Sequence, residues 1–238
     1  MEKPVYKRVL IKISGEALAG EKKTGFDFEF IADVCKTVKS CVDMGVEVGI
    51  VVGGGNFWRG VKDGAGHVER VSADRMGMLA TAMNCLAVAD VFKQIGAKAT
   101  IQTAVDIQGV GERYSTTEAI KHLENGEVVM FGCGTGCPFF STDTAAVLRA
   151  AEIGADAILL AKNIDGVYSA DPRVDASAVK YDSISYDDVL AQHLAVMDTT
   201  ATSLGMDNDI PVIVFALAQP NNIVRVLRGE KLGTLVTK

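Results

Sequence analysis

Short apolar runs alternate along the chain with longer segments in which apolar residues recur at helical spacing. The runs typical of buried strands are 9–13, 46–52, 99–102, 128–131, 157–161, 212–215 and 232–237. The helical segments are 31–45, 72–95, 116–124, 144–153, 182–194, one that begins at 197–199, and 221–227. Strands and helices that alternate in this way predict an α/β protein with a mostly parallel central sheet.

The helix predicted over 72–95 has a methionine-rich face. Apolar side chains share that face at helical spacing: Met76, Leu79, Met83, Ala87 and Val91. We interpret it as core or as a subunit interface rather than as a catalytic surface. Asp74 lies in the first turn, where a carboxylate either stabilises the helix dipole or contacts a ligand. The pattern favours neither interpretation.

Composition and charge exclude several classes of protein. Hydrophobic residues make up 48% of the 238 residues, the formal net charge is −6 and the pI is ≈ 5.1. An acidic chain lacks the basic stripe of a nucleic-acid groove, so we expect no nucleic-acid partner. We also expect no leader and no membrane span, because no apolar run is long enough.

The cysteines indicate a reducing compartment. There are five, an odd number, and most lie inside apolar runs, which fits the cytoplasm. Cys133 and Cys137 are spaced C-x3-C, but no second Cys or His cluster follows them. We therefore expect buried or loop thiols rather than zinc ligands.

Glycine-rich turns follow three of the predicted strands. They contain Gly15, the triple glycine 53–55, and the segment 131–144, FGCGTGCPFFSTDT, which leads through Asp143 into a helix. The carboxyl ends of parallel strands meet at one edge of a sheet, where ligands bind. Glycines and a helix start expose main-chain N–H groups there, so this edge suits phosphate groups. We expect two phosphate-bearing ligands bound end to end.

Lys12 lies near the end of the first predicted strand. It is either a solvated lysine on an edge strand or a cation delivered to the phosphate edge, and its position beside Ser14 and Gly15 favours the second. Two familiar nucleotide motifs fail. Gly55 and Gly60 have P-loop spacing, but Val61 and Lys62 follow instead of Lys-Ser or Lys-Thr. Gly132-x-Gly134 meets Cys137 where the dinucleotide fingerprint needs glycine.

The remaining motifs are recognisable as a set. KISGEAL at 12–18, VVGGGNFWRG at 51–60, DRMGMLAT at 74–81, GTGCPFFSTD at 134–143 and KNIDGVYSADP at 162–172 resemble bacterial uridylate (UMP) kinases, a branch of the amino acid kinase superfamily. The resemblance covers essentially the full length. One departure is Cys137, where that branch commonly has Asn, which puts any side-chain contact at this position in question.

The resemblance implies a fold and a reaction. The fold is a three-layer αβα sandwich with a mostly parallel central sheet, in one domain over 1–238 with an N-terminal acceptor lobe and a C-terminal ATP lobe. The reaction is transfer of the ATP γ-phosphoryl group to UMP, giving UDP and ADP, in pyrimidine nucleotide biosynthesis. Mg²⁺ would arrive with ATP rather than in a fixed protein site. The family is typically homohexameric, and GTP activation and UTP inhibition are possible.

The resemblance also implies site residues. For catalysis they are Lys12, Asp143 and Asp198. For ATP they are Lys12, Ile13, Ser14, Gly15, Gly55, Arg59, Lys162, Asn163, Tyr168 and Asp171. For UMP they are Gly54, Asp74, Thr135, Gly136, Cys137, Pro138, Phe139, Phe140, Ser141 and Thr142. A loop that in some members belongs to an allosteric GTP site corresponds to Gly20, Glu21, Lys22, Lys23, Thr24 and Gly25.

The chemistry agrees with this assignment. The UMP phosphate has a second pKa near ~6, so its oxygen is anionic at neutral pH and no general base is needed. Catalysis must align two polyanions and spread the charge on the transferred group, which suits Lys12, Arg59, Mg²⁺ and main-chain N–H groups. Two alternatives stay open: a kinase of a small carboxylate or carbamate on the same fold, and a non-catalytic nucleotide sensor.

Overall fold

The computed structural model describes residues 3–59, 64 and 66–238. Its strands form a single mixed sheet. Within these residues the sheet has nine strands in the order β4-β3-β5-β2-β1-β6-β8-β9-β7. The strands are β1 Arg8–Ile13, β2 Glu47–Val52, β3 Ala99–Thr103, β4 Glu112–Arg113, β5 Val128–Gly132, β6 Ala157–Lys162, β7 Ser183–Ser185, β8 Val212–Ala216 and β9 Thr234–Thr237.

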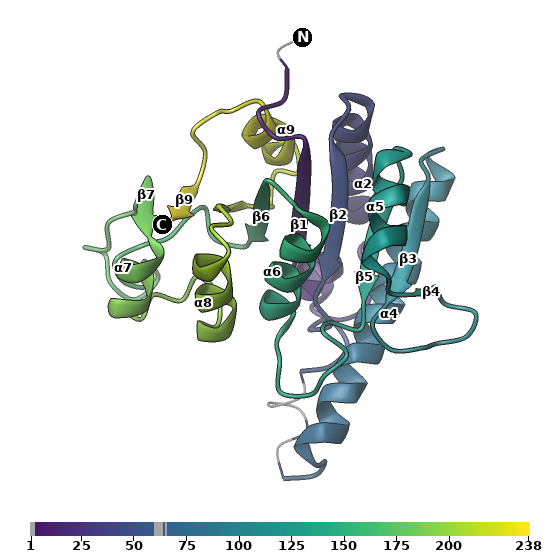
Figure 1. The fold of residues 1–238 in the computed structure, drawn as a ribbon. Coiled ribbons are helices and arrows are strands. Elements are labelled where there is room, and N and C mark those ends of the chain that lie inside the picture. The colour runs from purple at the N-terminus through teal and green to yellow at the C-terminus, as the bar shows by residue number, and fades with distance from the viewer. Residues whose placement is uncertain (1–2, 60–63, 65) are drawn as a thin grey trace.

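The sheet is mostly parallel, as the sequence predicts. β1 lies at its centre, parallel to β2 on one side and to β6 on the other. Only β9 and β7 run against the rest, because β9 pairs antiparallel with β8. The carboxyl ends of the other strands therefore meet at one edge, the lower edge in Figure 1.

Helices cover both faces of the sheet and complete the three layers. They are α1 Gly15–Ala19, the 3-10 turn η1 Gly20–Lys22, α2 Phe28–Asp43, α4 Arg70–Gln94, α5 Thr116–Glu124, α6 Thr142–Ile153, α7 Tyr186–Ala191, α8 Thr199–Asp207 and α9 Asn222–Leu227. α5, α6, α7 and α8 lie on the near face in Figure 1, and α2, α4 and α9 lie behind.

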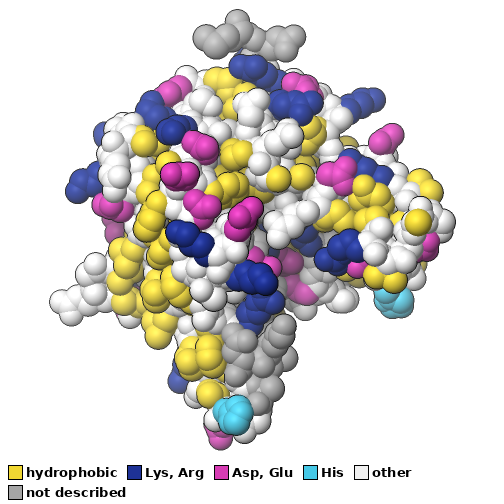
Figure 2. Space-filling model, turned by 180° about the vertical axis from the view of Figure 1, so that it is seen from behind, with side chains coloured by type: hydrophobic (Ala, Val, Ile, Leu, Met, Phe, Trp, Pro, Cys, Tyr) yellow, Lys and Arg dark blue, Asp and Glu magenta, His cyan; other side chains and the backbone are white. Residues whose placement is uncertain are grey.

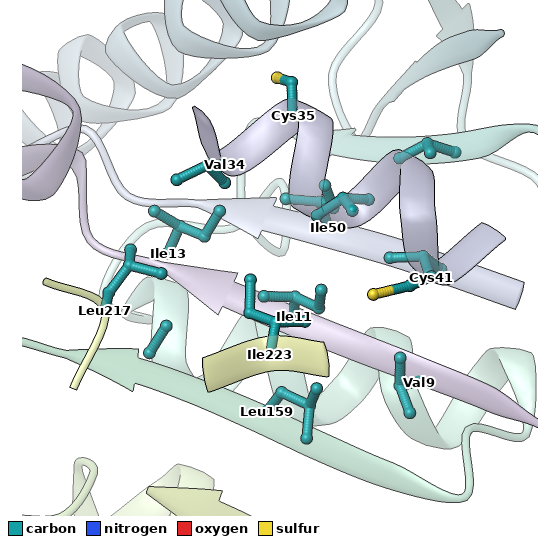
Figure 3. Close-up of a cluster of buried hydrophobic side chains, with 14 of the residues drawn as sticks. Val9, Ile11, Ile13, Val34, Cys35, Cys41, Ile50, Leu159, Leu217 and Ile223 are labelled. Carbon is teal, nitrogen blue, oxygen red and sulfur yellow. The ribbon is translucent and has the colours of Figure 1, made fainter. Parts of the chain in front are cut away.

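Alternate residues of β1 enter two separate cores, because successive side chains of a strand point to opposite faces. Val9, Ile11 and Ile13 pack with α2, α4 and α9, as Figure 3 shows for part of that cluster. Leu10 packs with α5, α6 and α8 on the other face. Burial on both faces explains why the central strands read as nearly continuous apolar runs.

The helix predicted over 182–194 is too long at both ends, because only Tyr186–Ala191 is helical. Ser183–Ser185 forms β7, which pairs with β9 so that Ile184 faces Val236. The helix starts only after Ser185, whose side chain accepts a hydrogen bond from Asp188 N and caps α7. Pairing with a strand more than 40 residues away decided the structure of this segment. α1, η1 and β4 were not predicted at all.

α4 corrects one expectation and refines another. Its length and composition suffice to cross a membrane, contrary to the expectation that no run is long enough. It is nevertheless a core helix, because Cys85, Val88 and Phe92 pack against the sheet. The predicted face is also only partly core, since Met76, Leu79 and Met83 are exposed. Figure 2 shows hydrophobic side chains exposed on this side of the molecule.

The central core gives a stability prediction. Val9 is fully buried in β1, whereas Val174 is 86% exposed. Val9→Ala should lower the free energy of unfolding by about 2 kcal/mol, since it removes buried apolar groups and leaves a cavity. Val174→Ala is the matched control and should change it by less than about 0.5 kcal/mol. Urea unfolding measures both, and equal effects would contradict the assignment of the core.

Candidate active site

The turn after β1 lies against the turn after β2. Ser14 caps α1 by accepting a hydrogen bond from Glu16 N at 3.2 Å. A side chain at Gly15 would come within 2.4 Å of Gly53 O and 2.8 Å of Gly55 N. Only glycine permits so close an approach of the two main chains. The Ser-Gly and triple-glycine motifs therefore form one surface.

The triple-glycine turn also lies against α4. Gly53 N donates to Ile13 O at 2.9 Å, which continues the β1–β2 ladder into the turn. A Cβ at Gly54 would meet Gly77 O at 2.9 Å. Arg59 follows the turn and pairs with Glu16 at 2.5 Å. Gly60, the last residue of the motif at 51–60, lies outside the described residues.

The segment between β5 and α6 is held by α4. Cys133 N donates to Thr81 Oγ1 at 2.7 Å, and Phe139 N donates to Asp74 Oδ2 at 2.7 Å. Arg70 Nε also donates to both carboxylate oxygens of Asp74. The Asp74 carboxylate thus contacts the glycine-rich segment across the cleft, so it does more than stabilise a helix start.

The start of α6 is tied to the start of α8. Ser141 caps α6, and its hydroxyl donates to Asp198. Thr144 Oγ1 donates to both Asp198 oxygens at 3.1 Å. Asp198 itself caps α8 by accepting a hydrogen bond from Ala201 N. Asp198 therefore fixes the turn in which Asp143 sits.

Lys12 and Asp143 form an ion pair at the centre of the edge. Lys12 Nζ lies 2.6 Å from Asp143 Oδ1, and their side chains are only 11% and 18% exposed. Among the described residues, no donor meets this oxygen with hydrogen-bond geometry. The contact is thus a charge pairing with an acceptor direction still open on the carboxylate.

Lys162 brings a second ammonium group beside this pair. Burial is the main cause that lowers the pKa of Lys162; Asp143 raises that pKa and the charge of Lys12 lowers it further. Its ammonium donates to Val196 O. Two cations and one carboxylate therefore lie near one another, which favours the binding of additional negative charge.

Two cavities flank the ion pair. The smaller has a volume of ≈ 150 Å³, and the predicted UMP residues that line it are Gly54, Asp74, Thr135, Cys137, Phe140, Ser141 and Thr142. The larger has a volume of ≈ 720 Å³, and the predicted ATP residues that line it are Lys12, Ser14, Lys162, Asn163, Tyr168 and Asp171. Thr142 on the first wall immediately precedes Asp143, which contacts Lys12 on the second wall.

Other predicted residues lie near these cavities without lining them. Ile13, Gly15, Gly55 and Arg59 belong to the joined turns between the two cavities. Gly136, Pro138 and Phe139 are outside the smaller cavity, and Phe139 is 65% exposed beneath the Arg70 guanidinium. Lys22, Lys23 and the rest of the loop 20–25 line neither cavity.

Sequence reasoning missed several residues of the site. Trp58 and Thr81 line the smaller cavity, and residues 192–196 line the larger one. Asn56 and Asn84 are buried beside the triple-glycine turn. A polar Asn84 on the core-facing side of an apolar helix was a visible signal, because buried polar groups need partners. Residues 192–196 carry no comparable signal.

The carboxyl ends of the parallel strands hold a Lys–Asp pair between two cavities. This arrangement is typical of α/β proteins that bind ligands at the carboxyl edge of the sheet. Residues 7–216 match the sequence model of the amino acid kinase family. The chain therefore belongs to the amino acid kinase family.

Three solved structures that are similar to this chain are all structures of UMP (uridylate) kinases. The UMP kinase from Bacillus anthracis is 40% identical, with a TM-score of 0.94, over 98% of this chain and 96% of that one. The UMP kinase from Ureaplasma parvum is 37% identical, with a TM-score of 0.92, over 98% and 99%. The uridylate kinase from Archaeoglobus fulgidus is 28% identical, with a TM-score of 0.74, over the full length of both chains.

Cysteine environments in the site give a chemical prediction. Burial raises the pKa of the Cys35, Cys41 and Cys85 thiols to about 12, whereas Cys137 is exposed at the smaller cavity. Because the thiolate is the reactive form, iodoacetamide at pH 8 should alkylate Cys137 well before the four buried thiols, which include Cys133. Peptide mass spectrometry measures this order. A Cys137→Ser variant should stay unlabelled until it unfolds; early labelling of buried thiols would contradict the structure.

Proposed function

We propose that this protein is a UMP kinase that transfers the ATP γ-phosphoryl group to UMP, giving UDP and ADP, in pyrimidine nucleotide biosynthesis. The observation that carries the proposal is the placement of the two cavities on either side of Lys12 and Asp143. Membership in the amino acid kinase family and the likeness to solved UMP kinases support it.

The larger cavity is the ATP site in this proposal. Its volume of ≈ 720 Å³ lies in the usual range for small-molecule sites. Lys12, Ser14 and Gly15 would meet the phosphates, with Gly55 and Arg59 beside them. Asn163, Tyr168 and Asp171, together with Lys162, would hold the rest of the nucleotide.

The smaller cavity is the UMP site. Asp74, with a carboxylate already oriented by Arg70, would bind the uridine moiety. Gly54 and the segment 135–142 would surround the nucleotide. The main-chain turns at Gly134 and Gly136, both with positive φ, direct this segment around the cavity. Cys137 N donates to Thr135 Oγ1 and Cys137 O accepts from the same hydroxyl, so the Thr135 side chain holds the main chain of Cys137 in place.

Catalysis in this site is a matter of position and charge. The UMP oxygen is anionic near pH 7, so the barrier lies in bringing two polyanions into line. An ammonium group has three donors, so Lys12 can contact Asp143 and still donate to a transferring phosphoryl oxygen. Asp143 holds Lys12 in place. Asp198 acts through α6 as a positioning residue, because its oxygens contact Ser141, Thr144 and Ala201.

Mg²⁺ would accompany ATP. Carboxylate oxygens are ligands that Mg²⁺ prefers, and among the described residues Asp143 Oδ1 has no hydrogen-bond donor and contacts Lys12, which lines the larger cavity, so the residues fit such an ion. When bound, Mg²⁺ neutralises charge on the phosphate oxygens. The Asp198 oxygens are already occupied by three donors, so Asp143 is the better candidate for a contact with the ion.

The preferred phosphoryl acceptor distinguishes this function from the alternatives. Purified protein with Mg-ATP should release ADP fastest with UMP, in a panel that also contains CMP, dCMP, glutamate and carbamate. Faster release with a carboxylate or with carbamate would identify a different kinase on the same fold. Nucleotide binding without ADP release would identify a sensor. The exposed phenylalanines after Pro138 favour a nucleotide acceptor.

The proposal extends to organisation and regulation. The elements around the smaller cavity lie before residue 143 and form an acceptor lobe, whereas residues 162–196 form an ATP lobe. The protein is a soluble enzyme, and free thiols buried in the core favour a cytoplasmic location. The loop 20–25 would bind GTP as an activator, and UTP would inhibit.

Lys12 gives the first functional prediction. Lys12→Ala should reduce turnover by on the order of 10²-fold or more, the usual effect of losing one preorganised charge partner. The steady-state rate of ADP release with saturating ATP and UMP measures it. Lys36→Ala, which removes an exposed lysine of α2, is the control and should keep full turnover. Near-normal turnover of folded Lys12→Ala protein would contradict the role.

Asp143 gives the second functional prediction. Asp143→Ala should cause a large loss of rate with the fold intact, because Lys12 then lacks the carboxylate that positions it. The same assay and a thermal unfolding curve measure the two quantities separately. A change confined to the melting temperature would mean that Asp143 only stabilises the start of α6.

The third prediction concerns the oligomeric state of the protein. We propose a homohexamer that uses the exposed face of α4, where Leu79 is 54% and Met83 46% exposed. A Leu79→Asp, Met83→Asp double variant should form smaller species, because charge in an apolar interface loses solvation. Light scattering after size-exclusion chromatography measures the mass. Val174→Asp should leave the mass unchanged; an unchanged mass in the double variant would exclude α4 as the interface.

A further inference from the structure

Two buried asparagines form a closed pair beside the candidate active site. Asn56 follows the triple-glycine turn and is 1% exposed; Asn84 lies in α4 and is fully buried. Asn84 Nδ2 donates to Asn56 Oδ1 at 2.8 Å, and Asn56 Nδ2 donates to Asn84 Oδ1 at 3.0 Å. The two amides thus exchange hydrogen bonds in both directions.

Each amide uses its remaining N–H on a main-chain oxygen. Asn84 Nδ2 donates to Gly53 O at 2.6 Å, and Asn56 Nδ2 donates to Gly25 O at 2.9 Å. All four N–H groups and both side-chain oxygens therefore have partners, and the reciprocal pattern fixes the orientation of both amides. Rotating either amide would place oxygen against oxygen.

The pair joins segments that are distant in the sequence. Gly25 N donates to Asn56 O at 3.3 Å, so Asn56 holds Gly25 through both its main chain and its side chain. A Cβ at Gly15 would lie 2.7 Å from Asn56 Oδ1, so Asn56 also borders the start of α1. One amide pair thus contacts the loop 20–25, the triple-glycine turn, α4 and α1.

We propose that Asn56 and Asn84 are positioning residues for phosphoryl transfer, which set the triple-glycine turn against the Ser14–Gly15 turn and transmit the position of the loop 20–25 to it. This inference rests on the proposed function. The pair touches neither nucleotide in this scheme. It acts by fixing Gly53 O, and with it the main chain of Gly54 and Gly55 on which both nucleotides would depend.

A structural role alone predicts a different outcome. Two amides that merely fill the core would affect the free energy of unfolding and leave the turnover of each folded molecule unchanged. Two amides that position the turn would affect the turnover of folded protein, because small displacements of groups in a transfer site cost up to about 10²-fold in rate.

Asparagine-to-aspartate variants separate these roles while keeping the side-chain shape. Ionised, Asn84→Asp loses its donors to Gly53 O and to Asn56 Oδ1. Asn56→Asp loses its donors to Gly25 O and to Asn84 Oδ1. Each variant keeps an acceptor for the amide of the other residue. Asn208→Asp is the matched control, because Asn208 is exposed at the C-terminal end of α8 and also donates to a main-chain oxygen, Leu204 O.

Turnover of the folded variants is the first measurement. We expect kcat to fall about tenfold or more in Asn84→Asp, with KM for UMP changed less than about threefold, and the control to match the wild type. The double variant should lose no more than the worse single variant, because the two residues act as one unit. A lowered melting temperature with unchanged kcat, or losses that multiply, would overturn the inference.

Amide hydrogen exchange is a second measurement that needs neither activity nor a folded variant. In the wild type, Gly25 N and Gly53 N should exchange through one common opening, since the pair links their segments. Fast exchange at Gly25 with full protection at Gly53 would overturn the link. If wild-type protein does not phosphorylate UMP, the proposed function fails by itself, and exchange still decides whether the pair couples the two turns.

Discussion

The ion pair between Lys12 and Asp143 is the central interaction of the candidate active site at the carboxyl edge of this sheet. It joins the end of the central strand β1 to the first turn of α6, with a separation of 2.6 Å between Nζ and Oδ1. The larger cavity is lined by Lys12 and the smaller by Thr142, the residue before Asp143, so the ion pair lies between the two cavities. Everything else at the edge serves to hold those two side chains where they are: Ser141, Thr144 and Asp198 fix α6, and the close main-chain contact at Gly15 fixes the end of β1.

Local charge, not net charge, defines the chemistry of this protein. The chain carries a net charge of −6, yet at the sheet edge Lys12 pairs with Asp143, and Lys162 lies near enough for both of these charges to affect its pKa. Burial lowers the pKa of Lys162, which is the direction expected when an ammonium group is taken out of water beside another cation. An anionic ligand relieves that arrangement. An acidic protein can therefore handle polyanions, provided that its few cations are placed where the phosphates lie.

α4 shows how one helix serves three purposes. Its buried side contributes Cys85, Val88 and Phe92 to the core. Its N-terminal half supplies Asp74 and Thr81, which hold the segment between β5 and α6. Its exposed side presents Met76, Leu79 and Met83. The polar Asn84 on the buried side connects the first purpose to the second, because its amide reaches the triple-glycine turn.

The sequence by itself determined the α/β class, most element positions and the gathering of strand-end turns at one edge, because these follow from local periodicity and from glycines that tolerate close main-chain contact. It also predicted Lys12, Ser14 and Asp143 at that edge, whereas the pattern left the role of Asp74 open and only the family resemblance assigned it to the site. Tertiary structure alone decided that Ser183–Ser185 is a strand, since its partner β9 is distant in the chain. It also decided which side of α4 faces solvent and that Asn56 pairs with Asn84. Such contacts join residues far apart in sequence, and no local pattern encodes which of many possible partners a side chain meets.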